Sequence, residues 1–338
     1  MQAETRSRGA FRKESAALRE RPVRGGPGAV AYTRGVERRY PFVNLTLEEI
    51  RDRLRGGGAR PLEATPVEEG RCNTLYRLRL EDGREALWKL YVRDSAACGL
   101  ETDLLGLVAG RVPVAPVLAR DLDARPAHAL LGWVEGENLE RILPGAAPAT
   151  QEALGRAVGE TLAAIHAFTF DGPGMLAAGP EVRPLPGANP FTDFIEEMLA
   201  GRAGERLGAA TAKRLAAFAA REGARVEEDA RASNILVRRE GGAWRVAAVV
   251  DWEWSVSLSP LMDLGNILRD RGWPIDPFRA ALLAAYRERA GNLPEDWPIR
   301  SDILELTSAL EFLSQPQDRP TIQGPAADRI RACLDRWS

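Results

Sequence analysis

The sequence is poor in the residues that build metal clusters and nucleophilic triads. It has two histidines, His128 and His166, and three widely spaced cysteines that form no Cys-x-x-Cys pair. A histidine-rich metal site is therefore excluded, and neither a zinc site nor a disulfide framework is expected. A Ser-His-Asp triad would need one of the two histidines, and no Gly-x-Ser-x-Gly sequence supports it. The cysteine usage favours a reducing, cytoplasmic location.

Long apolar runs and an excess of one charge are also missing. No apolar run reaches the ~18–20 residues that a membrane helix needs, and the basic N-terminus lacks the apolar segment of a signal peptide. The net charge is −2 and 45% of the 338 residues are hydrophobic, which argues against disorder and general nucleic-acid binding. We expect a cytoplasmic protein with two domains or lobes and no membrane or nucleic-acid partner. No feature indicates an oligomeric state.

Lysine is scarce, since only Lys13, Lys89 and Lys213 are lysines among 46 basic residues. The sequence has no Gly-x-x-x-x-Gly-Lys-Ser/Thr motif, which disfavours a P-loop enzyme. Lys89 lies in an apolar segment that is expected to form a strand. An unpaired buried ammonium is costly, so phosphate oxygens and a carboxylate are expected partners, with Glu101 on the following predicted helix as the candidate. The alternative is a lysine on an edge strand that points into solvent.

The order of predicted elements gives an α+β fold with a small strand-rich lobe followed by a larger helical lobe. We expect a basic, flexible tail over residues 1–40, an N-terminal lobe over 41–133 and a C-terminal lobe over 134–338. Thr46 is a candidate helix cap, residues 74–80 and 86–91 predict an antiparallel hairpin, and residues 172–177 are expected to form a loop. The other predicted elements are a helix at 95–109, strands at 113–118 and 128–134, and helices at about 151–168, 190–222, 259–270, 277–290, 300–314 and 325–336.

Asp229, Asn234 and Asp251 are set around two short apolar runs. Asn234 begins the run through residues 235–237, and Asp251 ends the run through residues 244–250. Pairing of these runs as strands would bring Asn234 and Asp251 to one edge, with Asp229 on the preceding loop. Oxygen ligands that converge at a loop edge suit Mg²⁺, and Mg²⁺ suits a nucleotide. Asp and Asn also serve as turn formers and helix caps, which is the structural alternative.

Two further segments are candidates for nucleotide contacts. A turn that contains Gly70 and Asn73 precedes the predicted hairpin, and its backbone N–H groups could face phosphates. Most glycine turns are only turns, so this signal is weak by itself. The strand that ends at Gly132, Trp133 and Val134 leads into the connection between the lobes, where backbone donors and acceptors are available to an adenine.

Taken together, these residues resemble the aminoglycoside phosphotransferase-like family, which has a two-lobed protein-kinase-like fold. The resemblance covers roughly residues 45–270. It is strongest in the runs 229–237 and 249–254, and it includes Lys89, Glu101 and the runs 162–166 and 259–264.

The resemblance implies an ATP-dependent phosphotransferase that acts on a small-molecule hydroxyl. It makes Asp229 the catalytic base and makes Asn234 and Asp251 the magnesium ligands. It pairs Lys89 with Glu101 and the nucleotide phosphates, and it places adenine at Gly132–Val134 under the loop at Gly70 and Asn73. It also implies a structural role for His166.

One departure from the family pattern concerns the residue two positions before Asp229. The family normally has histidine there, whereas this chain has Glu227. The extra negative charge could raise the pKa of Asp229, change metal affinity, or be neutralised by Arg231. A weakly active or inactive pseudokinase that serves as a nucleotide-binding or scaffold protein is therefore the alternative. The lack of a recognisable activation segment between Asp251 and Asp263 disfavours a protein-substrate kinase.

The acceptor is expected to bind in the helical half. An acidic site for a cationic acceptor, such as an amino sugar or amino alcohol, is one possibility, and a neutral sugar or another alcohol is the other. The acidic residues considered for such a site are Glu253, Asp263, Asp276, Glu295, Asp296 and Asp302. Solvated helix faces and caps are the structural alternative for these residues.

Overall fold

The computed structural model describes residues 38, 40–68, 72–185, 187, 189–222, 234–269 and 274–337, without the side chains of Asn234 and Trp254. These residues all belong to one compact unit, residues 37–338. The predictions for Asp229, Glu227, Gly70 and most of the tail over 1–40 fall outside the described residues.

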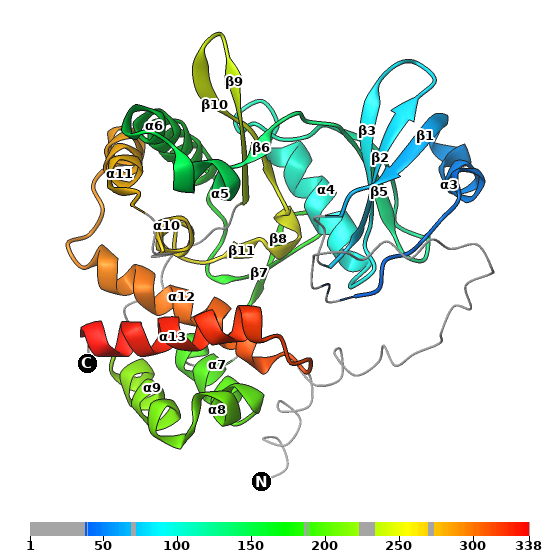
Figure 1. Ribbon diagram of the computed structural model, residues 1–338. Coiled ribbons are helices and arrows are strands. Elements are labelled where there is room, and N and C mark those ends of the chain that lie inside the picture. Colours follow the sequence, from blue (N-terminus) through cyan, green and yellow to red (C-terminus); the bar gives the residue numbers. More distant parts are fainter. Residues whose placement is uncertain are drawn as a thin grey trace. The chain divides into compact units, whose positions relative to one another are not determined.

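A five-stranded antiparallel sheet forms the first part of the described chain, with strand order β1-β2-β3-β5-β4 (Figure 1). Its strands are β1 (Pro61–Pro66), β2 (Thr74–Leu80), β3 (Glu85–Leu90), β4 (Val117–Asp121) and β5 (His128–Gly132). The predicted hairpin is confirmed, since Thr74 pairs with Leu90 and Arg79 with Glu85.

Alternation along β3 gives the sheet two different faces. Trp88 and Leu90 pack in one apolar cluster with Ile50 and Leu54 of helix α3 (Leu47–Leu54). Because successive side chains of a strand point to opposite faces, Lys89 points away from this cluster. The sequence period therefore places the buried lysine on the face opposite α3.

The N-terminus of α3 forms as the sequence predicts. Thr46 accepts a hydrogen bond from the backbone N–H of Glu49, and the Glu49 carboxylate accepts one from the backbone N–H of Thr46. This capping box satisfies backbone donors that the first helical turn would otherwise leave unpaired. It fixes the start of the helix that covers the sheet.

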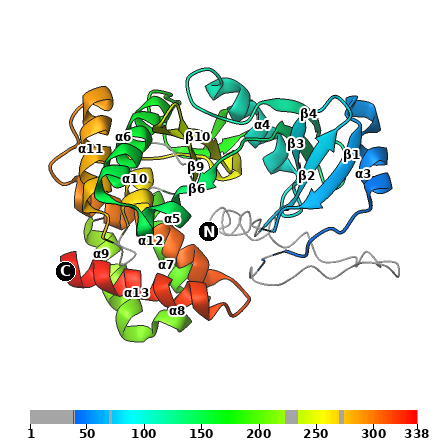
Figure 2. The ribbon, with the colours of Figure 1, turned by 45° about the horizontal axis from the view of Figure 1, so that its top comes forward.

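Helices dominate the rest of the described chain (Figures 1 and 2). These helices are α5 (Leu139–Ile142), α6 (Pro148–Ile165), α7 (Pro190–Leu199), α8 (Arg202–Leu207), α9 (Ala209–Glu222), α10 (Leu261–Leu268), α11 (Asp276–Ala290), α12 (Trp297–Ser314) and α13 (Pro320–Trp337). Helix α4 (Ala96–Val108) lies between β3 and β4 in the chain. None of the helices in the described ranges is long and apolar enough to cross a membrane.

Helices α6 and α11 pack at close range because α6 presents glycines to its partner. A Cβ added at Gly155 would lie 2.3 Å from the carbonyl oxygen of Phe278, and one added at Gly159 would lie 2.3 Å from that of Leu282. The predicted His166 lies just after α6, buried between Tyr286 of α11 and Asp263 of α10. These contacts tie three helices together.

Two three-stranded sheets interrupt the helical part. One has the order β10-β9-β6 and the other β11-β7-β8. Their strands are β6 (Glu137–Asn138), β7 (Gly174–Ala177), β8 (Glu181–Pro184), β9 (Asn234–Glu240), β10 (Ala243–Val250) and β11 (Val256–Ser257).

The loop predicted over residues 172–177 is wrong over its last four residues, because Gly174–Ala177 is strand β7. Four residues are too short to display a strand period, so this strand depends on its neighbours β8 and β11. A Cβ at Gly174 would lie 2.3 Å from the carbonyl oxygen of Arg183, which explains the glycine in the strand.

The predicted fold class is confirmed: the chain has an α+β, two-lobed, protein-kinase-like fold with antiparallel sheets and a larger helical part. The predicted division between the lobes at residues 133 and 134 stays a prediction.

Candidate active site

Lys89 is the centre of a buried cluster of charges. Its side chain is 4% exposed, and its Nζ lies 2.7 Å from Oε2 of Glu101. The same Nζ lies 3.1 Å from Oδ1 of Asp251 and 3.5 Å from Oε2 of Glu253. The structure therefore contains the ion pair that the sequence predicts between Lys89 and Glu101, and it adds two carboxylates from the chain after β10.

Glu101 is held by a second donor besides Lys89. It lies on α4 with a side chain that is 3% exposed, and its Oε2 accepts a hydrogen bond of 2.7 Å from the hydroxyl of Tyr91. Tyr91 directly follows β3, so one short segment supplies both donors to this carboxylate. The sequence gives no signal for the contact between Tyr91 and Glu101, because Tyr91 belongs to no recognised motif.

The three carboxylates outweigh the cost of burying the ammonium group. Burial alone would lower the pKa of Lys89, but Glu101, Asp251 and Glu253 together raise that pKa well above its ordinary value. Burial raises the pKa of Glu253, as do the negative charges of Asp251 and Glu101, while Lys89 opposes the shift. Lys89 is thus held protonated among the three carboxylates.

Asp251 adopts a left-handed backbone conformation where the chain leaves β10, with φ 63° and ψ 46°. Such a conformation is uncommon for residues other than glycine, although aspartate tolerates it better than most. It turns the chain into the short 3-10 helix η4 (Trp252–Trp254), where Nε1 of the buried Trp252 donates to the carbonyl of Val249 at 3.0 Å. This turn directs both Asp251 and Glu253 towards Lys89.

The predicted pairing of the two motif strands is present. Asn234, the first residue of β9, pairs with Val250, the last residue of β10. Asn234 and Asp251 are therefore brought to the same end of the hairpin, as the sequence predicts. Asp229 lies outside the described residues, so its position relative to this edge stays a prediction.

The accessible carboxylate at this edge fits a magnesium ion whose remaining ligands are water and phosphate oxygens. Asp251 offers a carboxylate that is 53% exposed, so one oxygen-bearing group remains accessible. The described residues contain no group of three or more His, Cys, Asp and Glu side chains arranged as a metal site. Mg²⁺ commonly takes one or two protein carboxylates and completes its shell with water and phosphate oxygens, so the accessible carboxylate of Asp251 suits it.

The turn before β2 reaches the same cluster through Asn73. This side chain is buried, and its Nδ2 donates a hydrogen bond to Oε2 of Glu253. The backbone carbonyl of Asn73 accepts a hydrogen bond of 2.7 Å from Arg38. The sequence predicts Asn73 as a site residue, and the structure adds its partner Glu253, which the sequence suggests only for an acceptor site.

The strand end proposed for adenine has part of its backbone engaged within the protein. The amide of Gly132 donates to the carbonyl of Pro116 at 2.8 Å, and that of Trp133 donates to the carbonyl of Glu85 at 3.1 Å. The Trp133 ring lies under the guanidinium of Arg77, with 4.2 Å between the cation and the ring centroid. Recognition of a base by backbone amides would therefore begin at Val134.

The acidic residues considered for a cationic acceptor are largely engaged elsewhere. Asp263 is buried against His166, at 3.1 Å from its Nε2. Asp296 pairs with Arg300 on α12, and Asp302 pairs with Arg336 on α13. Glu253 belongs to the Lys89 cluster. These four residues therefore pair at separate places and do not form one acidic site.

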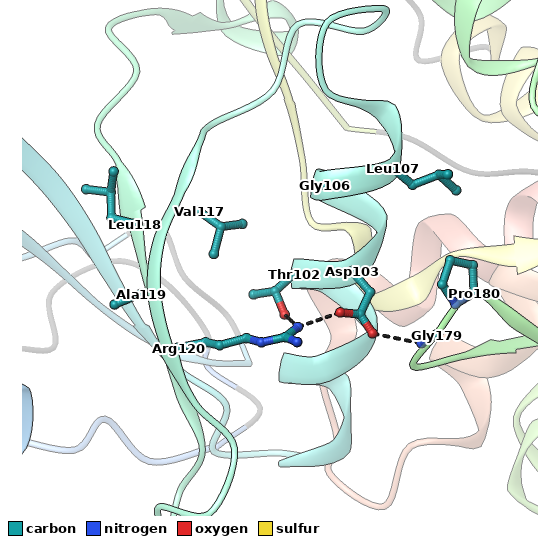
Figure 3. A pocket seen from close by; sticks show the side chains of 10 residues that line it. All are labelled: Thr102, Asp103, Gly106, Leu107, Val117, Leu118, Ala119, Arg120, Gly179 and Pro180. Atoms are coloured by element: carbon teal, nitrogen blue, oxygen red, sulfur yellow. Dashed lines mark hydrogen bonds and ion pairs between the residues drawn. The ribbon is translucent and has the colours of Figure 1, made fainter. Parts of the chain in front are cut away.

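A separate open cavity of about 570 Å³ lies between α4, β4 and the turn at Gly179 (Figure 3). In Figure 3, Arg120 of β4 reaches across to Thr102 and Asp103 of α4, and Asp103 accepts a hydrogen bond of 2.7 Å from the backbone N–H of Gly179. The other lining residues are Gly106, Leu107, Val117, Leu118, Ala119 and Pro180. None of the Lys89 cluster lines this cavity.

Comparison with known proteins gives a match that spans most of the described chain. The profile of the Phosphotransferase enzyme family matches residues 63–300. None of the curated proteins is similar enough to count as a relative.

Two solved structures illustrate the likeness in fold. A thermostable mutant of aminoglycoside phosphotransferase APH(4)-Ia, in a ternary complex with ADP and hygromycin B, has 15% identity and a TM-score of 0.59, with coverage of 85% of this chain and 98% of that one. The macrolide 2'-phosphotransferase MphH from Brachybacterium faecium has 18% identity and a TM-score of 0.57, with coverage of 84% and 97%.

Proposed function

Because the chain belongs to the Phosphotransferase enzyme family, we propose that it transfers the γ-phosphoryl group of ATP to a hydroxyl of a small molecule. The observation that carries this proposal is the buried Lys89, whose Nζ lies within 3.1 Å of both Glu101 and Asp251. A lysine held at fixed charge beside an accessible carboxylate is an arrangement suited to binding phosphate oxygens next to a metal ion.

Each predicted site residue has a role in this proposal. Lys89 binds phosphate oxygens and is oriented by Glu101. Asp251 and Asn234 are the ligands of Mg²⁺, which would neutralise phosphate charge when bound. These roles agree with the pairing of Asn234 and Val250 at the strand ends.

Asp229 is the proposed base. It accepts the proton of the acceptor hydroxyl as the oxygen attacks the γ-phosphorus, and the bond from that phosphorus to the bridging oxygen of ADP breaks. Phosphoryl transfer requires mainly positioning and charge neutralisation, so a single carboxylate near the acceptor is sufficient protein chemistry.

The remaining predicted residues would contact the nucleotide. Gly70 and Asn73 belong to the turn proposed to cover the phosphates. The strand end at Gly132, Trp133 and Val134 would meet the adenine, with the backbone from Val134 onward as the recognition segment because the two preceding amides already donate within the protein.

The proposed acceptor is a hydroxylated small molecule. One structural neighbour is an aminoglycoside phosphotransferase in complex with ADP and hygromycin B, and another is named a macrolide 2'-phosphotransferase. An amino sugar or amino alcohol, the cationic class considered from the sequence, remains in the proposal beside neutral sugars and other alcohols. Glu253, Asp263, Asp296 and Asp302 pair at separate places in the protein, so they give no reason to prefer a cationic acceptor.

Titration calorimetry tests this function directly. ATP is titrated into the native protein with and without Mg²⁺, and then into Asp251→Asn. Magnesium-dependent binding that is lost in the variant supports the site, and a screen of amino sugars, amino alcohols and neutral sugars follows. Absence of ATP binding by the native protein would refute the proposal.

Glu227 motivates the second candidate function, a pseudokinase that binds nucleotide without transferring phosphate. Glu227→His separates the two candidates. If the native protein binds MgATP but shows no turnover with any acceptor, and the variant gains turnover, the native chain is a degenerate relative. Equal turnover by both proteins makes the departure neutral.

A further inference from the structure

One buried carboxylate oxygen joins two segments that are far apart in the sequence. Oε2 of Glu253 accepts the hydrogen bond from Nδ2 of Asn73, and the same oxygen lies 3.5 Å from Nζ of Lys89. Asn73 and Glu253 are separated by 180 positions. The turn before β2 and the lysine of β3 therefore both contact one oxygen atom on the segment that follows Asp251.

The position of Asn73 is fixed from a second direction. Arg38 donates to its backbone carbonyl at 2.7 Å, and the next residue, Thr74, accepts a hydrogen bond of 2.9 Å from the backbone N–H of Val43. Asn73 is 5% exposed, and its Oδ1 has no hydrogen-bond partner among the described residues. Its side chain is therefore oriented by Glu253, while its backbone is held by the segment before α3.

Ordinary packing does not account for a carboxylate in this place. Glu253 has a side chain that is 5% exposed, and burying a charge costs free energy that a single ammonium at 3.5 Å does not fully return. An apolar residue of similar volume would fill the same space at no such cost. Besides its charge beside Lys89, a carboxylate supplies a directional hydrogen bond to Asn73, which an apolar residue cannot supply.

We propose that Glu253 is a positioning residue, which sets the turn at Asn73 at a fixed distance from Lys89 and Asp251. The proposal rests on the function proposed above, because the groups positioned are those that would surround the nucleotide phosphates. Glu253 acts through Asn73 and Lys89 and is not itself assigned a contact with substrate. When the link is lost, the turn and the lysine are no longer held together, and nucleotide binding weakens.

A reversal of the hydrogen-bonding pair tests this role. Asn73→Asp replaces the donor with a carboxylate opposite Glu253, and the two like charges repel. In the double variant Asn73→Asp with Glu253→Gln, the glutamine Nε2 can donate to the new aspartate, so the link is restored with donor and acceptor exchanged. Asn73→Ala removes the donor without adding charge and serves if the aspartate variant does not fold.

The measured quantities are the Kd for AMP-PNP with Mg²⁺ and the urea midpoint of unfolding without nucleotide. Asn73→Asp is expected to raise the Kd by about tenfold or more, as loss of a hydrogen bond to a charged group implies. The double variant is expected to recover most of that loss. Glu63→Gln is the control, because Glu63 lies on β1 with an exposed carboxylate that pairs with Arg79 outside the cluster.

The outcomes separate this inference from the proposed function. If the native protein binds the nucleotide and neither Asn73→Asp nor Asn73→Ala changes the Kd, the positioning role is overturned and the function stands. Recovery of the unfolding midpoint without recovery of the Kd also overturns it, since the pair is then merely structural. If the native protein binds no nucleotide, the proposed function fails, and this role fails with it.

Discussion

Replacing Glu101 by glutamine perturbs the buried ion pair with almost no change in side-chain shape. The Lys89 and Glu101 side chains are 4% and 3% exposed and lie 2.7 Å apart. The variant keeps an oxygen that can accept from Tyr91 or Lys89, and it removes one negative charge. The test therefore isolates the electrostatic contribution of Glu101 from its packing.

The expected loss of unfolding free energy depends on the carboxylates that remain near the Lys89 ammonium group. Breaking a buried ion pair by removing one partner typically destabilises a protein by about 3–5 kcal/mol, because the other charge is left uncompensated. Here Asp251 and Glu253 stay at 3.1 and 3.5 Å from the same Nζ. We expect a loss at the lower end of that range, about 3 kcal/mol. Nucleotide affinity is expected to fall as well, because Lys89 loses the group that orients it.

Equilibrium unfolding in urea measures the first effect, and calorimetric titration of ATP with Mg²⁺ measures the second. The matched control is Asp103→Asn, two residues further along α4. Asp103 pairs with Arg120 beside the cavity, and the side chains are 24% and 40% exposed, so this pair is expected to contribute at most about 1 kcal/mol. The reasoning is refuted if Glu101→Gln and Asp103→Asn unfold at the same urea concentration and bind nucleotide equally well.

Two further predictions concern packing and pH. Gly159→Ala should destabilise the protein by several kcal/mol, because the new Cβ would lie 2.3 Å from the carbonyl oxygen of Leu282. Gly106→Ala should instead stabilise α4 by up to about 1 kcal/mol, because no atom lies within 4 Å of the new Cβ. Thermal unfolding compares the two variants, and equal shifts in Tm would contradict this difference in packing. Burial lowers the pKa of His128 beside Trp88, so neutral His128 contributes stability above its unfolded pKa of about 6.5, and this contribution is lost as the pH falls through the lower folded pKa. His128→Phe should therefore lose less unfolding free energy than the native protein between pH 7 and pH 5, and parallel pH profiles would show that His128 is not responsible.

Local sequence patterns were sufficient for the elements that depend on neighbouring residues. Thr46 and Glu49 form the predicted capping box, and the alternation through residues 74–91 gives the predicted hairpin. The same reasoning anticipated the pairing of Asn234 with the end of the next strand. Helix caps, side-chain alternation and short-range strand pairing are all set by residues close in the chain, so one sequence is enough to read them.

The sequence by itself also predicted an acidic partner for Lys89, because an unpaired ammonium in an apolar strand is costly if it is buried. It left open a lysine on an edge strand that points into solvent, and the structure decided for the buried pair. Only the tertiary structure decided that Tyr91 shares Glu101, that the left-handed turn at Asp251 brings Glu253 to the same cluster, and that Glu253 holds Asn73. Strand β7 likewise needed its partners. The physical reason is that these contacts join segments far apart in the chain, and their free energy comes from burial and pairing that exist only once the lobes have folded.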